Sequence, residues 1–326
     1  MIHDPKMIRT AALAWLVLLA PAWAAPPPAP PADMAARIGE YGSDEALVTV
    51  YEAKGQLFLS GPGRSAEVLQ PLAPGRYAAQ DGDAVFTPEA MTLKGARLPR
   101  RDIGAETVAR IQAGVRGNPE GVRAAALAAS PPAEPPPRRA SDLVDLTTVA
   151  PDIRLDIRYA GANNFMGFPL YERPAAFLQR PAAEALGRAA KTLRAQGFGL
   201  LIHDGYRPWF VTKMFWDATP EAAHVFVADP AQGSRHNRGC AVDLTLYDLK
   251  TGQPVEMTGR YDEMSRRSFA DYVGGTSRQR WARDLLRQAM EAEGFSVYPE
   301  ERWHFDYKDW REYGIGVKTF TELQTN

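Results

Sequence analysis

The sequence contains a single cysteine, Cys240, among 326 residues. One thiol cannot form an intramolecular disulfide, so the fold does not depend on oxidative cross-links even if the chain is exported. An excess of basic charge is also missing, because 38 lysine and arginine residues stand against 39 aspartate and glutamate residues, for a formal net charge of -1. This balance argues against a nucleic-acid partner. The length permits two domains.

Apolar runs long enough to cross a membrane are absent as well. Residues 11–20 are apolar, but this run is far shorter than the roughly 20 residues that a span needs, and Pro21 interrupts it. A lysine and an arginine precede the run, and the small-residue pattern of a cleavage site follows at residues 22–24. We therefore predict that residues 1–24 are a signal peptide. The exported protein, periplasmic or extracellular, is expected to have no membrane span after signal removal.

The first part of the mature chain, residues 34–127, predicts a small β-rich module with a helical tail. Short, partly alternating apolar segments are separated by Gly, Pro and Asp, as in strands joined by tight turns. These expected strands are residues 46–51, 56–59, 76–79 and 84–87. The tail is expected as one helix over residues 106–113 and a second that begins at Asn118-Pro119, an N-cap and first-turn pair. Histidine and cysteine are both missing here, which indicates an accessory role.

Residues 128–140 predict a linker, and residues 141–326 predict the catalytic domain. Three consecutive prolines and no apolar periodicity favour a stiff, polyproline-like spacer in the linker. The domain after it predicts an α+β fold, a compact antiparallel sheet with helices packed around it. Expected strands there include residues 198–203 and 241–247, and expected helices include residues 181–196, 208–216 and 277–293.

Two stretches of the second domain contain the residue types of a catalytic zinc site. Alternation over residues 241–247 places Asp243 on the strand face opposite the apolar side chains. Gly239 allows the preceding turn to bring His236 beside that carboxylate, and residues 301–304 add Glu301 and His304. A catalytic zinc takes three nitrogen or oxygen ligands and keeps a fourth position open for water. We assign His236, Asp243 and His304 to one Zn²⁺ and Glu301 to the water.

Other reactive side chains receive a structural interpretation. His203 lies on an apolar strand, where a histidine is more often a hydrogen-bonded core residue than a metal ligand. His224 lies outside any motif. Ser234 is not expected to act as a nucleophile, because His236 is assigned to the metal and no second histidine lies where an activating base would be needed. Cys240 is expected to be a small buried thiol, since two imidazoles, a carboxylate and water already fill a zinc site.

Three ordered motifs resemble those of a known family. Residues 234–243 fit the pattern S-x-H-x-x-G-x-A-x-D, residues 301–304 fit E-x-x-H, and residues 204–208 read D-G-Y-R-P. From roughly Asp142 to the C-terminus the chain resembles the VanX-type D-alanyl-D-alanine dipeptidases, zinc D,D-peptidases of the Hedgehog-like fold. The spacing of that family selects Glu301 over Glu300 as the base.

The resemblance implies a substrate and further roles. It implies hydrolysis of the small dipeptide D-Ala-D-Ala, with Arg207 stabilising the oxyanion. Ser234 and Tyr159 match residues that contact the dipeptide, and Asp262 matches an acidic residue near its amino end. Around Asp262 the segment departs from the usual pattern at Arg260, Tyr261 and Phe269, which concerns specificity and not the metal. The accessory module is expected to associate with the cell wall.

Two alternatives stay open. The same zinc chemistry in an open cleft would suit a D,D-carboxypeptidase or a related peptidase that trims peptidoglycan. A non-enzymatic, zinc-stabilised module that binds the wall is the alternative of another class. Glu301 and Arg207 argue against this last alternative, because a binding module needs neither a base nor an oxyanion partner. Release of D-Ala from the dipeptide or from a wall pentapeptide separates the two peptidases.

Overall fold

The computed structural model describes residues 25–324. The predicted signal peptide, residues 1–24, lies outside the described residues. Within the described range, no helix combines the length and the apolar character that a membrane crossing requires. A short helix, α1 (Ala32–Ala35), opens the described chain.

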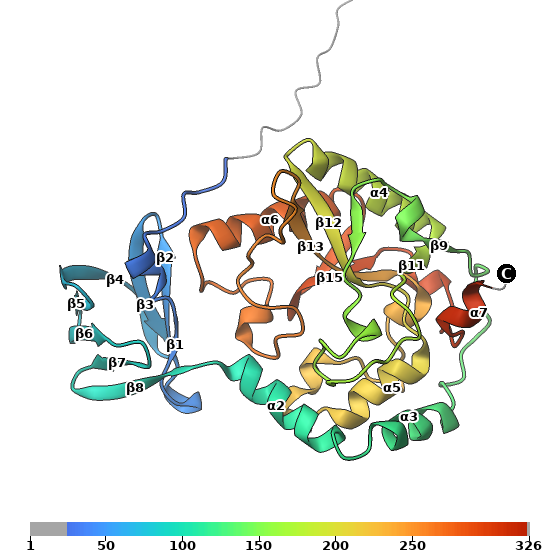
Figure 1. Ribbon diagram of the computed structural model, residues 1–326, viewed down its shortest axis with the longest axis horizontal. Helices are drawn as coiled ribbons and strands as arrows, with labels where there is room; N and C mark the ends of the chain where they lie inside the picture. The colour runs from blue at the N-terminus through green and yellow to red at the C-terminus, as the bar shows by residue number, and fades with distance from the viewer. Residues whose placement is uncertain (1–24, 325–326) are drawn as a thin grey trace, which may run out of the picture.

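The N-terminal module is a closed antiparallel barrel in which each strand pairs with the next and β1 pairs with β8 (Figure 1). Its strands are β1 (Gly39–Tyr41), β2 (Val48–Ala53), β3 (Gln56–Gly61), β4 (Arg64–Ala73), β5 (Arg76–Ala79), β6 (Gly82–Phe86), β7 (Ala90–Leu93) and β8 (Ala96–Arg101). Alternate residues of β2 and β3 point inward, so that Val50, Leu57 and Leu59 are buried in a small core. The expected β-rich module is therefore present, with strands that the sequence pattern did not indicate.

The helical tail packs on the C-terminal domain, and Glu106 at its start forms an ion pair with Arg101 of β8 at 2.7 Å. Helices α2 (Ile103–Val115) and α3 (Pro119–Ala128) lie beside α5 (Trp209–Ala218) of the C-terminal domain, residues 141–324 (Figure 1). Ile111, Val115 and Ala126 are buried in the same apolar cluster as the core of that domain. The amphipathic faces of both helices are thus covered by the C-terminal domain.

A five-stranded sheet forms the centre of the C-terminal domain. Its strand order is β10 (Ile153–Leu155), β12 (Phe198–Asp204), β13 (Ala241–Asp248), β15 (Glu301–Tyr307) and β14 (Phe295–Tyr298). The prediction of an antiparallel sheet is wrong at one edge, because β10 and β12 are parallel. Between these strands the chain passes through α4 (Arg180–Arg194), and a crossover of this kind returns the chain in its original direction. Strands β9 (Leu143–Asp145) and β11 (Phe177–Gln179) pair separately.

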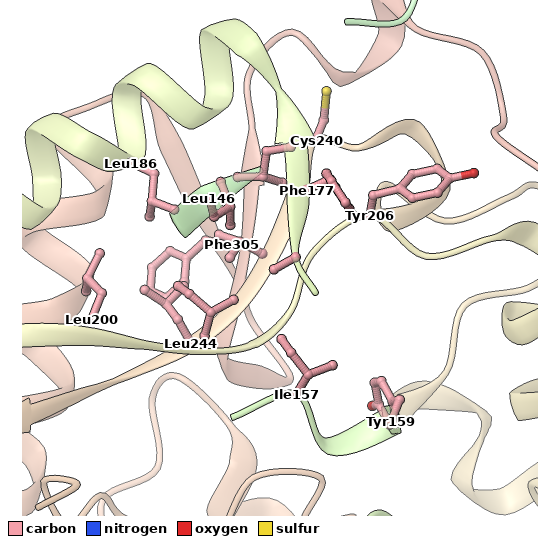
Figure 2. Packing of buried hydrophobic residues seen from close by; sticks show 14 of the residues in the cluster. Leu146, Ile157, Tyr159, Phe177, Leu186, Leu200, Tyr206, Cys240, Leu244 and Phe305 are labelled. Carbon is pink, nitrogen blue, oxygen red and sulfur yellow. The ribbon is translucent and has the colours of Figure 1, made fainter. Parts of the chain in front are cut away.

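Helices α4 and α6 (Ser277–Glu291) contact each other and pack on the sheet. Figure 2 shows Leu200, Leu244 and Phe305 gathered beneath the helix that carries Leu186, and all four side chains are buried. The capping residue of α6 is Thr276, which forms a capping box with Gln279. The last described element is α7 (Phe320–Gln324).

Polar contacts join the barrel to the C-terminal domain, and an ion pair joins the proline-rich linker to the same domain. Glu52 of β2 accepts the backbone N–H of Ser277 at 2.7 Å, and the Tyr272 hydroxyl donates to Glu40 of β1 at 3.0 Å. In the proline-rich segment, Arg139 forms an ion pair with Asp309 at 2.8 Å. The segment therefore runs along the surface of the C-terminal domain.

Candidate metal centre

Neighbouring strands supply two of the three expected ligands. Asp243 on β13 and His304 on β15 are directly opposite each other in the antiparallel register, which places their side chains on the same face of the sheet. His236 begins a short 3-10 turn that ends at Gly239, whose φ is 65°. A side chain at Gly239 would also meet Leu143 at 2.5 Å. Only glycine fits this turn, which directs His236 toward Asp243.

The three side chains converge on one point. His236 Nε2 lies 3.0 Å from His304 Nδ1 and 3.2 Å from Asp243 Oδ1, and His304 Nδ1 lies 3.0 Å from the same oxygen. Ligands about 2.0–2.1 Å from a tetrahedral ion lie roughly 3.3 Å apart. All three residues are buried, and Asp243 Oδ1 has no hydrogen-bond partner. A buried carboxylate oxygen that faces two ring nitrogens without a hydrogen bond fits a metal ligand.

The outer atom of each ligand has its own partner. The second ring nitrogen of His236, Nδ1, lies 2.7 Å from the carbonyl of Gly205, and His304 Nε2 lies 2.9 Å from Asp306 Oδ1. The Tyr261 hydroxyl donates to Asp243 Oδ2 at 2.9 Å. Partners of this kind fix the ring tautomers and leave the inner atoms free to bind a metal.

Electrostatics in the cluster favours positive charge. Burial opposes ionisation of Asp243, but His236 and His304 outweigh it and hold the pKa of this carboxyl well below its usual value. Burial also opposes protonation of His304, but Asp306 and Asp243 outweigh it and raise the pKa of this imidazole to about 10. A cluster that holds a proton so strongly provides the negative potential that a divalent cation needs.

Glu301 and Arg207 lie at the edge of the cluster. Glu301 Oε2 is 3.7 Å from His304 Nδ1, and burial is the largest cause that raises the pKa of Glu301 to about 8. A cation at the cluster would act in the opposite direction and favour the carboxylate. Arg207 is buried and contacts Asp204 through its Nε at 2.9 Å and through a terminal nitrogen at 2.8 Å. Its guanidinium is 3.8 Å from Asp243 Oδ2, so it is held beside the metal cluster.

These residues line one pocket of about 670 Å³ that opens to solvent, and the three residues expected at the substrate line it too. Tyr159 donates its hydroxyl to Asp262 Oδ1 at 2.9 Å, while Asp262 Oδ2 is buried without a hydrogen-bond partner. Burial raises the pKa of Asp262 to about 8. The Ser234 hydroxyl accepts the backbone N–H of His236 at 3.2 Å, so it also supports the turn that carries the first ligand.

The other two histidines of the described residues and the cysteine lie apart from the cluster. His203 is buried and stacks on Tyr261 with ring centres 4.4 Å apart, and His224 stacks on Trp216 at 3.8 Å. Cys240 is a buried free thiol in the apolar core. Among the described residues, the group of His, Cys, Asp or Glu side chains that could hold a metal ion is His236, Asp243 and His304.

Sequence reasoning missed three supporting residues. Asp306 is two residues after His304 on β15, so strand alternation could have placed it on the ligand face. Asp204 belongs to the D-G-Y-R-P motif, but no role was assigned to it; it binds Arg207 and accepts the Tyr171 hydroxyl at 2.7 Å. Tyr261 was noted only as a departure from the family pattern, and no local signal connects it with Asp243.

Comparison with known proteins identifies the family. The sequence pattern described as D-ala-D-ala dipeptidase matches residues 139–321. The chain is 33% identical over 181 residues to D-alanyl-D-alanine dipeptidase of Escherichia coli, covering 56% of this chain and 92% of that protein. The proteins of the same name from Enterococcus faecium and Streptomyces coelicolor are 35% and 36% identical, over 50% and 48% of this chain and 90% and 87% of their own lengths.

A solved LD-carboxypeptidase structure overlaps 58% of this chain and 76% of its own, at 17% identity and a TM-score of only 0.31. The matched region leaves the barrel, α2 and α3 outside. It includes all three motifs, and the resemblance they indicated is confirmed: the chain belongs to the D-Ala-D-Ala dipeptidase family of metallopeptidases.

Proposed function

We propose that this protein hydrolyses the dipeptide D-Ala-D-Ala with one Zn²⁺ held by His236, Asp243 and His304. The observation that carries the proposal is the unpaired Asp243 oxygen that faces two imidazole nitrogens at 3.0 and 3.2 Å in a buried pocket. The relatives named above are D-alanyl-D-alanine dipeptidases, which supports the same substrate here. When bound, zinc would supply Lewis-acid chemistry and make water a nucleophile near neutral pH.

Glu301 acts as the general base in this proposal. Its carboxylate takes the proton of the attacking water and returns it to the amine that leaves when the peptide bond breaks. Arg207 faces the same pocket and places a cation beside the negative charge that develops on the carbonyl oxygen. The two contacts with Asp204 hold the guanidinium in place before substrate arrives.

Tyr159, Ser234 and Asp262 are proposed to bind the dipeptide. Asp262 Oδ2 has no hydrogen-bond partner, and the substrate ammonium would supply one. A longer peptide or an acylated dipeptide lacks that charge and would leave the buried acid unpaired, which is costly. The pocket therefore favours a free dipeptide over a wall peptide.

Replacement of Glu301 by Ala tests the mechanism. The variant should retain one zinc per chain and lose about 100- to 10,000-fold in kcat, the usual contribution of general acid–base catalysis. Glu300→Ala, one position away, is the matched control and should keep wild-type activity. Zinc content by elemental analysis and D-Ala release by a coupled assay are the measurements, and an active Glu301→Ala enzyme would refute the base assignment.

The alternative D,D-carboxypeptidase activity is tested with the same D-Ala assay, by comparing two substrates of the wild-type enzyme. A D,D-carboxypeptidase would release D-Ala faster from a wall pentapeptide than from the dipeptide.

We also propose that residues 1–24 direct export, so the protein recovered from cells should begin near Ala25, as N-terminal sequencing would report. Association of the barrel with the cell wall remains a prediction, which a pull-down with purified peptidoglycan can measure.

A further inference from the structure

Helix α2 lies outside the region shared with the family, yet it forms one wall of a second cavity next to the proposed substrate pocket. This cavity, about 1010 Å³, is lined on one side by α2 and on the other by residues near Asn164 and Asp262. Phe165, Asp262 and Glu263 line both cavities. We propose that α2 positions Asp262 and so sets the preference for a free amino terminus, an inference that rests on the proposed function.

Asp262 needs support from its surroundings. Its backbone φ is 56°, in the left-handed region that residues other than glycine rarely adopt. Its Oδ1 is held by the Tyr159 hydroxyl at 2.9 Å. A buried aspartate in this backbone conformation keeps it only where neighbouring contacts impose it. The residue that follows provides those contacts.

Glu263 holds the loop on either side of it together. Its carboxylate accepts the backbone N–H of Arg260 at 2.7 Å and the hydroxyl of Ser265 at 3.0 Å, one bond for each oxygen. Its backbone carbonyl also accepts the hydroxyl of Ser268. Glu263 is 2% exposed, so these bonds are protected from water and fix the segment that carries Asp262.

Helix α2 rests directly on Glu263. A Cβ atom at Gly104 would lie 2.3 Å from Cγ of Glu263, a distance far below van der Waals contact, so the helix backbone and this side chain touch. At the same end of the helix, the capping residue Asp102 accepts a bond from the Arg260 guanidinium at 2.6 Å. The position of Glu263 is therefore set from outside the family domain, by α2.

The other end of α2 supports the second loop of the pocket. Gln112 donates to the backbone carbonyl of Asn164 at 3.2 Å. The side-chain nitrogen of Asn164, Nδ2, in turn donates to the backbone carbonyls of Gly161 at 2.6 Å and Phe168 at 3.0 Å, which closes the loop. That loop presents Phe165 to the pocket. Both loops beside the proposed amine site thus depend on one helix.

Two glycines in α2 provide a matched test. In Gly104→Ala the new methyl group must displace Glu263, whereas in Gly114→Ala nothing lies within 4 Å of the new Cβ. Alanine is the better helix former at both positions, so a loss confined to Gly104→Ala reports the contact with Glu263. The measured quantity is the ratio of kcat/KM for D-Ala-D-Ala to that for N-acetyl-D-Ala-D-Ala, which lacks the ammonium.

We expect Gly104→Ala to lower this ratio about tenfold or more, since a misplacement on the order of 1 Å can cost up to about 100-fold. Most of the change should be a higher KM for the free dipeptide, with zinc content unchanged, and Gly114→Ala should match the wild type. An unchanged ratio in Gly104→Ala, or an equal loss with both substrates, would overturn the proposal. A wild-type enzyme that does not hydrolyse D-Ala-D-Ala would instead overturn the proposed function.

Glu263→Gln gives an independent test if Gly104→Ala does not fold. Glu263 uses both carboxylate oxygens as acceptors, and an amide offers only one acceptor oxygen. The substitution keeps the volume but removes the negative charge that faces the Arg267 guanidinium at 3.4 Å, and the Ser265 hydroxyl can keep its bond only by reversing it and accepting from the new amide nitrogen. The loop that carries Asp262 should therefore loosen, and the substrate ratio should fall in the same direction. A folded Glu263→Gln enzyme with the wild-type ratio would also refute the positioning role.

Discussion

Tyr261→Phe removes one hydroxyl from the outer side of the proposed zinc site. That hydroxyl donates to Asp243 Oδ2 at 2.9 Å and lies 3.1 Å from the Tyr159 hydroxyl. The ring itself stacks on His203 and packs edge-on against Trp303, and phenylalanine keeps both contacts. The substitution therefore removes the bond to a proposed metal ligand, together with the contact with Tyr159, and leaves the ring packing in place.

The expected magnitude follows from the charge and the burial of Asp243. A hydrogen bond to a charged group contributes about 1.5–3 kcal/mol. At about 1.4 kcal/mol for each factor of ten in an equilibrium constant, zinc affinity should fall roughly 10- to 150-fold. In other metalloproteins, loss of a hydrogen-bond partner of a metal ligand costs about 10- to 100-fold in metal affinity or activity. This agrees with the expected range.

Competition with a chelator measures the zinc dissociation constant, and Tyr272→Phe is the control. Tyr272 is also a buried tyrosine whose hydroxyl donates to a carboxylate, that of Glu40 at 3.0 Å, but it does so at the barrel interface. The control should lose stability and keep its zinc affinity. If Tyr261→Phe binds zinc as tightly as the wild type, the hydroxyl does not support Asp243 as a ligand.

Three further predictions concern Asp306, Thr276 and Cys240. Asp306→Asn weakens the partner of His304 Nε2 and should reduce zinc affinity about 10- to 100-fold in the same competition assay. Thr276→Ala deletes the side-chain cap of α6 and should lower the free energy of unfolding by about 0.5–2 kcal/mol, measured by urea denaturation. Burial raises the pKa of the Cys240 thiol to about 12, so iodoacetamide at pH 8 should label the unfolded chain and spare the native one. Because the folded pKa lies above that of the unfolded thiol, the contribution of Cys240 to stability should fall as the pH rises above about 8.5.

Local patterns predicted the elements that carry the site. Alternation over residues 241–247 indicated a strand with Asp243 opposite Val242, and β13 has this arrangement. Pro119 and Asn118 marked the start of α3, where Asn118 caps the helix by accepting the Gly121 N–H at 2.9 Å. Such signals are short-range, because strand period and helix caps depend only on neighbouring residues.

Pairing and packing required the folded chain. The parallel pair of β10 and β12 depends on the crossover through α4, and no single segment specifies that direction. The pattern did not predict four of the barrel strands. Most side chains of β4 and β8 are exposed and show no apolar alternation, and β1 and β7 are only three and four residues long. Closure of the barrel depends on β1 meeting β8, which are about sixty residues apart in the chain.

By itself the sequence determined the family of this protein and the chemistry proposed for it: the proposed ligands, the proposed base and the arginine are in three motifs whose spacing could be read directly. Only the tertiary structure decided what supports that chemistry. The Tyr261 bond to Asp243 and the contact of Gly104 with Glu263 join residues far apart in the chain. A motif can be recognised in the sequence because a metal needs fixed ligand types at fixed spacing. The supporting contacts depend on how distant surfaces pack, which no local pattern encodes.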